Sequence, residues 1–129
     1  MSTSINQEIF NWSGPLGLPR FENIASEDYA AAFDQGLIDD RNDINRIADN
    51  PDTPTFENTI VALEMSGEHL SRVSALFWNF SGSNSNDVLR ALERDIAPKL
   101  SRHASETAAN TALFARIDSL WQHRESLQL

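Results

Sequence analysis

Apolar residues recur at spacings of three and four through the middle of the chain, and this periodicity constrains the fold more than any other feature. The stripe consists of Phe56, Ile60, Leu63, Gly67, Leu70, Val73, Phe77 and Phe80. Near-heptad spacing places these residues on one face of an α-helix, and that face must be buried against neighbouring helices. The pattern therefore predicts a long amphipathic helix in an all-α protein.

The ends of this helix are marked by residues that favour helix starts and stops. Thr53 is suited to the N-cap, and Pro54 then takes the first helical position, where its missing N–H costs no hydrogen bond. Residues 81–84 (Ser-Gly-Ser-Asn) supply a stop and a turn. Gly67 costs about 1 kcal/mol relative to alanine in a helix interior, so we expect it to allow close approach of a neighbouring helix.

A preceding helix is predicted between Ser26 and about Asp49. Ser26 is suited to the N-cap, and the acidic residues that follow it favour the positive end of the helix dipole. The pair Asn50-Pro51 ends the helix. Its apolar stripe is formed by Tyr29, Phe33, Leu37, Ile44 and Ile47.

Two further helices are predicted after residue 84. Ser85 can cap the first of them, whose apolar residues are Val88, Leu89, Leu92, Ile96 and Leu100. Pro98 should kink or split this helix near Ile96, because an interior proline removes one hydrogen bond and clashes with the preceding turn. Asn110 can cap the last helix, whose apolar face is formed by Leu113, Phe114, Ile117, Leu120 and Trp121.

The expected architecture is an all-α, antiparallel bundle of about four helices over residues 26–129. No segment of the sequence shows sustained strand alternation. Residues 1–25 differ, because Gly14, Pro15, Gly17 and Pro19 interrupt a segment that carries several apolar side chains. This segment is predicted to be an extended N-terminal arm that packs on the chain's own helices rather than contacting a substrate.

Charge and composition argue against several classes of partner. The chain has 19 acidic and 10 basic residues, a formal net charge of −9 and no cysteine. Nucleic acid and anionic membranes require clustered positive charge, so we expect neither as a partner. Without cysteine, disulfides and cysteine-ligated zinc are excluded. The sequence has no secretory signal pattern and no run of about 20 apolar residues, which favours a cytoplasmic protein.

No catalytic, cofactor-binding or metal-binding residue is predicted in this chain. The histidines His69, His103 and His123 lie 34 and 20 residues apart, so no two of them share a helical turn. Adjacent carboxylates such as Asp39 and Asp40 point in different directions on a helix and do not form an acid–base pair. The sequence also lacks a Gly-x-Ser-x-Gly elbow, the usual setting of a serine nucleophile.

Aromatic residues are the remaining candidates for a binding surface. Phe77, Phe80, Phe114 and Trp121 lie at helical spacing on apolar faces, so we expect them in the core. Trp78 falls beside the main stripe of its helix. We expect it to face either a further domain or a substrate channel.

Three stretches of sequence resemble a known family of enzymes. Residues 50–60 read Asn-Pro-Asp-Thr-Pro-Thr-Phe-Glu-Asn-Thr-Ile, residues 113–118 read Leu-Phe-Ala-Arg-Ile-Asp, and residues 121–127 read Trp-Gln-His-Arg-Glu-Ser-Leu. Together they resemble the N-terminal region of the bacterial peptidyl-dipeptidases, of the thimet oligopeptidase family of zinc metallopeptidases. The resemblance runs from about Phe10 to Leu129.

The resemblance implies an activity whose catalytic residues are not in this chain. Members of the family release dipeptides from the C-terminus of short peptides, and they hold zinc through a helical His-Glu-x-x-His motif. This chain has no such motif. The resemblance therefore implies that the chain forms part of a substrate-channel wall, is inactive alone, and adjoins a catalytic domain that binds the zinc.

A second interpretation stays open at this point. The chain can instead be a free-standing helical interaction module that kept a peptidase-like sequence but binds another protein. In either case an isolated piece is expected to expose apolar surface and to self-associate at high concentration.

Overall fold

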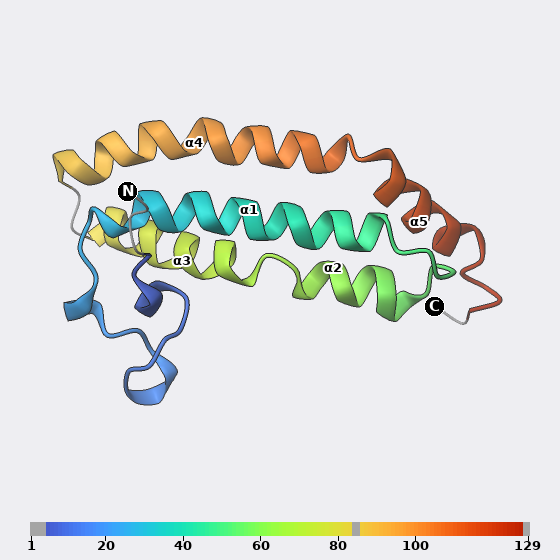
Figure 1. Cartoon of the computed structure of the whole chain (residues 1–129), viewed down its shortest axis with the longest axis horizontal. Coiled ribbons are helices and arrows are strands. Elements are labelled where there is room, and N and C mark those ends of the chain that lie inside the picture. Colours follow the sequence, from blue (N-terminus) through green and yellow to red (C-terminus); the bar gives the residue numbers. More distant parts are fainter. Residues whose placement is uncertain (1–4, 84–85, 128–129) are drawn as a thin grey trace.

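The fold is given by a computed structural model that describes residues 5–83 and 86–127, with side chains described outside residues 80–83. Within those residues the chain forms helices and no strand, which confirms the expected all-α class. The main helices are α1 (Asp28–Ala48), α2 (Ala62–Met65), α3 (Glu68–Ser83), α4 (Asp87–Ala108) and α5 (Thr111–Gln122). In Figure 1, α1 lies between α4 on one side and the nearly collinear α2 and α3 on the other.

Helix α1 follows the predicted stripe but begins differently. All five predicted apolar residues of the stripe are buried, and the helix ends at Ala48 with Asp49 as its C-cap. The predicted N-cap Ser26 is wrong, because Glu27 holds the cap position and makes no side-chain capping bond. The first turn is instead secured by Asp28, whose carboxylate accepts a hydrogen bond of 2.8 Å from the Ala25 N–H.

The long helix predicted from residue 53 is divided into three pieces. A π-helical segment, η4 (Phe56–Val61), leads into α2, and α3 begins only after a break at residues 66–67. The cap is Thr55 rather than Thr53. The Thr55 hydroxyl accepts from the Asn58 N–H at 3.0 Å, and the Asn58 side chain accepts from the Thr55 N–H at 2.7 Å, which is a reciprocal capping box.

Gly67 breaks the helix, and a second glycine, Gly36, marks a close approach between the backbones of α1 and α3. Gly67 has φ of +68°, a left-handed conformation that an α-helix interior does not contain. The tight contact between α1 and α3 occurs at Gly36, where an added Cβ would lie 3.0 Å from the Leu70 Cα. The expectation that Gly67 lies inside a helix is therefore wrong, whereas the expected close approach of a neighbouring helix is confirmed, because a Cβ at Gly67 would lie 2.5 Å from Oδ1 of Asp40 on α1.

Pro98 was predicted to kink or split its helix near Ile96, and the split is wrong, because α4 is continuous through Pro98. Pro98 is exposed, so the carbonyl that loses its hydrogen-bond partner can be hydrated. The N-cap is Asn86, whose side chain accepts from the Leu89 N–H at 2.8 Å. Ser85, the predicted cap, lies outside the described residues, as does Asn84 of the predicted stop. Helix α3 itself continues to Ser83.

Helix α5 begins where predicted but buries a different face. The Asn110 side chain accepts from the Leu113 N–H at 3.0 Å, which confirms the predicted cap. Leu113 and Leu120 are buried, whereas Phe114 is 66% exposed and Trp121 is 61% exposed. The core positions predicted for these two aromatic residues are therefore wrong. Figure 1 shows α5 continuing onward from α4 and crossing the end of α1.

Two apolar clusters hold these helices together. The larger joins α1, α3, α4 and the arm, and it contains Ile9, Phe10, Tyr29, Ala32, Phe33, Val73, Leu76, Phe77, Leu89 and Ile96. The smaller joins α1 to α5 through Ile44, Ile47 and Leu113. The prediction that the arm packs on the chain's own helices is thus confirmed for residues 9–10.

Candidate functional site

The three histidines lie on α3, on α4 and directly after α5, and they do not converge. The His69 Nδ1 atom lies 2.8 Å from Asp39 Oδ2, and its ring stacks on Phe10 with the ring centroids 4.3 Å apart. The His103 Nε2 atom lies 2.5 Å from Asp40 Oδ2. His123 Nδ1 instead bonds the Ser119 carbonyl at 2.8 Å. Within the described part of the chain, no group of three or more His, Cys, Asp or Glu residues could hold a metal ion.

The adjacent carboxylates of α1 diverge as predicted, and each meets a histidine from another helix. Asp39 reaches His69 on α3, whereas Asp40 reaches His103 on α4. These partnerships were not predicted, because they depend on which helices pack beside α1. A clue in the sequence was that Asp39 and Asp40 are successive residues, so their side chains must leave α1 in different directions.

The Asp40–His103 pair is the buried polar contact between α1 and α4. Both side chains are largely excluded from solvent, and His103 Nδ1 is buried with no hydrogen-bond partner among the described residues. Because the carboxylate of Asp40 accepts, Nε2 of His103 is the donor. A buried polar group is costly to leave unpaired, so this contact fixes the lateral position of α4 on α1.

An open groove of about 590 Å³ runs between α2–α3 and α4, with α1 beneath it. We call it the α3–α4 groove. Its apolar lining includes Ile44, Leu63, Leu70, Ala104 and Ala108. The Asp40–His103 pair also lines it. The groove is therefore a mainly apolar surface, and α1 contacts both of its sides.

Gly67, at the break between α2 and α3, lies directly against the Asp40 carboxylate that pairs with His103. A Cβ added at Gly67 would lie 2.5 Å from Asp40 Oδ1, so only glycine leaves room for that carboxylate. The Gly67 N–H also points to Asp43, at 3.3 Å from its Oδ2. The break, Asp40 and His103 thus form one connected arrangement across three helices.

Replacing Gly67 with alanine is expected to lower the free energy of unfolding by about 2–3 kcal/mol. The positive φ alone costs a non-glycine residue about 1 kcal/mol, and the new Cβ must also displace Asp40 from His103. Urea denaturation of the variant and the parent measures the loss.

The matched control is Gly17→Ala. Gly17 has φ of +74°, but an added Cβ there meets nothing within 4 Å. It should therefore lose only the conformational part, about 1 kcal/mol. Equal losses at the two positions would show that the contact with Asp40 contributes nothing.

Arg116 is a buried polar residue that the sequence interpretation did not single out. It extends from α5, is only 7% exposed, and donates to the Asn50 carbonyl at 2.7 Å and to the Asp52 carbonyl at 3.0 Å. It also donates to Asn58 Oδ1 at 3.0 Å. Arg116 thereby fastens the loop before η4 to α5, within stretches of sequence that carry the family resemblance.

Trp78 was predicted to lie away from the core, and the structure confirms that it is exposed. Its ring packs edge-to-face on Phe77, with the centroids 5.0 Å apart.

Among the described residues, no helix combines the length and the apolar content that crossing a bilayer requires.

Comparison with known proteins gives the chain its relatives. No family model matches it. The dipeptidyl carboxypeptidase of Escherichia coli (strain K12) is 41% identical over 127 residues, which cover 98% of this chain and 19% of that protein. The dipeptidyl carboxypeptidase of Salmonella typhimurium is 40% identical over 115 residues, which cover 89% of this chain and 17% of that protein. The chain spans about a fifth of the length of these relatives.

The chain is helical, and over nearly its whole length it is similar to about a fifth of the sequence of these relatives. The resemblance inferred from residues 50–60 and 113–127 is confirmed. The chain belongs to the dipeptidyl carboxypeptidase family, of whose sequence it represents one part.

Proposed function

We propose that the chain forms the N-terminal helical region of a cytoplasmic, zinc-dependent peptidyl-dipeptidase of the thimet oligopeptidase family. In that role it shapes the wall of a channel that admits short peptides and excludes folded proteins. The observation that carries the proposal is the 41% identity, over 127 residues, to a protein named dipeptidyl carboxypeptidase. The proposal assigns the α3–α4 groove, whose sides α1 holds in place, to this wall.

The proposal places the hydrolytic chemistry outside the chain. The sequence has no His-Glu-x-x-His motif, and its three histidines do not converge, each having a different hydrogen-bond partner. The residues described here therefore do not fit a zinc site, and no step of the reaction is derived from them. The contribution of this chain is to confine a peptide, while other polypeptide binds the metal and activates water.

A chimera tests the proposal directly. In it, this chain replaces the matching 127-residue region of the E. coli dipeptidyl carboxypeptidase. We expect the chimera to bind zinc and to release a dipeptide from an N-blocked tripeptide. A folded, zinc-loaded chimera that cannot release the dipeptide would contradict the channel-wall role and would favour the free-standing interaction module.

The chain alone provides the control for the chimera. Purified in the same way, it should contain no stoichiometric zinc and leave the tripeptide intact. One equivalent of zinc per chain together with dipeptide release would overturn the proposal that catalysis belongs to other polypeptide.

A further inference from the structure

The loop formed by residues 13–20, which we call the arm loop, is closed at its base by one carboxylate. Glu8 accepts from the Arg20 N–H at 2.7 Å, from the Ser13 hydroxyl at 2.7 Å and from the Ser13 N–H at 3.1 Å. These bonds, the one from Arg20 first, hold the pKa of Glu8 below its ordinary value of 4.5. The carboxylate is therefore ionised at neutral pH and keeps the two ends of the loop together.

The tip of the arm loop is a tight turn that places leucine in an unfavourable conformation. Leu16 has φ of +62° and Gly17 has φ of +74°, as in a type I′ turn, and the Leu18 N–H donates to the Pro15 carbonyl at 3.2 Å. The first of these two positions usually carries asparagine, aspartate or glycine. A Cβ at Gly14 would lie 2.5 Å from the Leu18 carbonyl oxygen, so the turn is also closely packed across its neck.

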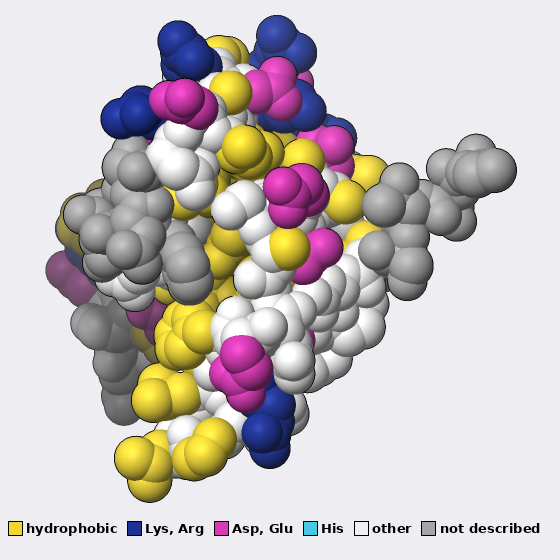
Figure 2. All heavy atoms as spheres, turned by 90° about the vertical axis from the view of Figure 1, so that its left-hand side faces the viewer, with side chains coloured by type: hydrophobic (Ala, Val, Ile, Leu, Met, Phe, Trp, Pro, Cys, Tyr) yellow, Lys and Arg dark blue, Asp and Glu magenta, His cyan; other side chains and the backbone are white. Residues whose placement is uncertain are grey.

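The side chain of Leu16 is almost fully exposed to solvent. Leu16 is 97% exposed, and Leu18 and Phe21 beside it are also exposed. Figure 2 shows hydrophobic side chains gathered at the lower tip of the molecule, which the arm forms. The unfavourable backbone conformation of Leu16 is therefore not offset by burial of its side chain, and this points to a role in binding.

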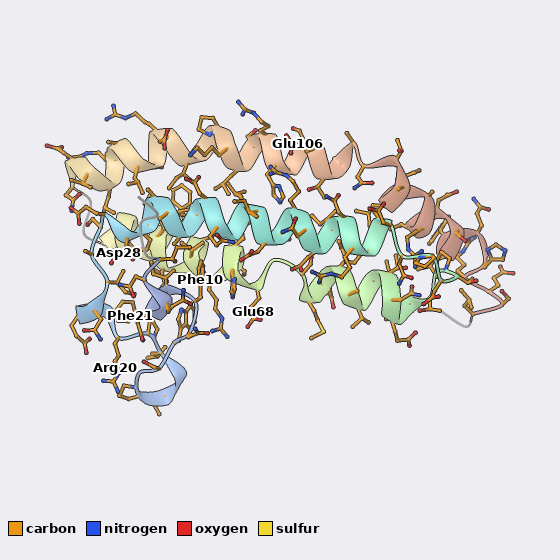
Figure 3. The ribbon with its side chains drawn as sticks, in the orientation of Figure 1. Phe10, Arg20, Phe21, Asp28, Glu68 and Glu106 are labelled. Carbon is orange, nitrogen blue, oxygen red and sulfur yellow. The ribbon has the colours of Figure 1, made fainter. Side chains whose placement is uncertain are left out.

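The base of the arm is anchored on α3, so the tip has a fixed position. Phe10 is buried and stacks on His69, and the Arg72 guanidinium donates to the Phe10 carbonyl. Arg72 also lies over the Trp12 ring, 5.2 Å from its centroid. Figure 3 shows Phe10 where the arm meets α3, with Arg20 and Phe21 farther out. The loop therefore presents Leu16 in a preorganised way, which lowers the entropy lost on binding.

We propose that the arm loop is a docking hook whose Leu16 side chain inserts into an apolar pocket on the remaining part of a dipeptidyl carboxypeptidase polypeptide. This inference rests on the proposed function and extends it to a specific contact.

The length of the relatives indicates which polypeptide would supply the pocket for Leu16. The match to the E. coli protein covers 98% of this chain, so the arm loop lies inside the shared region. The same match covers 19% of that protein, which leaves about four fifths of it, 100% minus 19%, as polypeptide available to meet the hook. A second copy of this chain and a lipid surface are the alternatives that the experiment separates.

The test is the substitution Leu16→Asn, measured in two contexts. In the free 129-residue chain, asparagine tolerates the positive φ better than leucine, so the unfolding equilibrium constant should fall about fivefold. In the E. coli chimera described above, the same substitution removes the inserted side chain, so the temperature of unfolding should fall. This opposite response is specific to docking, because a purely structural role would move both proteins in one direction.

A photocrosslinking residue at position 16 of the chimera locates the contact. We expect crosslinks to peptides of the E. coli portion. Crosslinks confined to this chain, to a second chimera or to added anionic vesicles would overturn the proposal, and so would the absence of any crosslink. Equal responses of the free chain and the chimera to Leu16→Asn would overturn it as well.

The outcome for the unsubstituted chimera separates the two proposals. An active chimera that is indifferent to Leu16→Asn leaves the channel-wall function standing and removes the hook. An unsubstituted chimera that is folded but inactive contradicts the proposed function, and the hook proposal fails with it.

Discussion

Replacing Phe77 with alanine is expected to lower the free energy of unfolding by about 3–5 kcal/mol. Phe77 lies on α3 and is fully buried in the larger apolar cluster. Its ring meets those of Tyr29 and Phe33 of α1 edge-to-face, at centroid distances of 5.6 and 5.3 Å. The substitution removes these two contacts and the one with Trp78, and it leaves a cavity between α1 and α3, where close packing at Gly36 limits relaxation.

The control is Phe114→Ala, the same change on an exposed face of α5. Phe114 is 66% exposed, so its loss should alter stability by no more than about 0.5 kcal/mol. Urea denaturation of both variants, with the slopes compared as well as the midpoints, gives the two losses. A loss at Phe114 as large as that at Phe77 would contradict the orientation of α5 and restore the core position first inferred from its spacing.

The apolar stripe from Phe56 onward predicted helical structure correctly, but it indicated one helix where the structure has three segments, and Phe56 itself is 42% exposed. Helices α2 and α3 are nearly collinear and both pack on α1, so the stripe continues across the break between them. Periodicity reports which side of a helix is apolar. Leu63, before the break, packs against the smaller cluster, whereas Val73 and Phe77, after it, lie in the larger one. The break depends on the Asp40 carboxylate occupying the place of a Cβ, a contact between residues far apart in sequence.

The error in α5 has a related cause. Leu113, Arg116 and Leu120 form the buried stripe, while Phe114 and Trp121 lie one residue further round the helix. From sequence alone, the charge of Arg116 indicates that the helix face carrying it is exposed. The rings of Phe114 and Trp121 indicate instead that their face is buried. The structure buries the arginine because two carbonyls of the loop before η4 and the side-chain amide oxygen of Asn58 in η4 accept its hydrogen bonds.

The candidate site was predictable to a smaller degree than the fold. Divergence of Asp39 and Asp40 follows from helix geometry alone. Their pairing with His69 and His103 requires knowing that α3 and α4 flank α1, which the spacing of the histidines does not contain. The strained turn at Leu16 was likewise hidden, because Gly14, Pro15 and Gly17 predict a turn without specifying the sign of φ at the residue between them.

Replacing Arg116 with alanine is expected to cost about 3 kcal/mol. Each hydrogen bond from a buried guanidinium contributes about 1.5–3 kcal/mol, and some of this is recovered when water reaches the exposed oxygens. The substitution would leave the carbonyls of Asn50 and Asp52 without their donor and would free the loop that leads into the Thr55 cap. We therefore expect both lower stability and faster amide exchange in residues 50–58.

Two further variants separate the hydrogen-bond geometry of Arg116 from its charge. Arg116→Lys keeps the charge but cannot bond three oxygens with one planar group, so it should recover less than half of the loss. Arg46→Ala removes an arginine whose side chain is 76% exposed and forms an ion pair with nearby Asp43, and it should cost no more than about 0.5 kcal/mol. If Arg116→Lys were as stable as the parent, the charge alone would suffice, and the planar set of three bonds would not be what fastens α5 to the loop before η4.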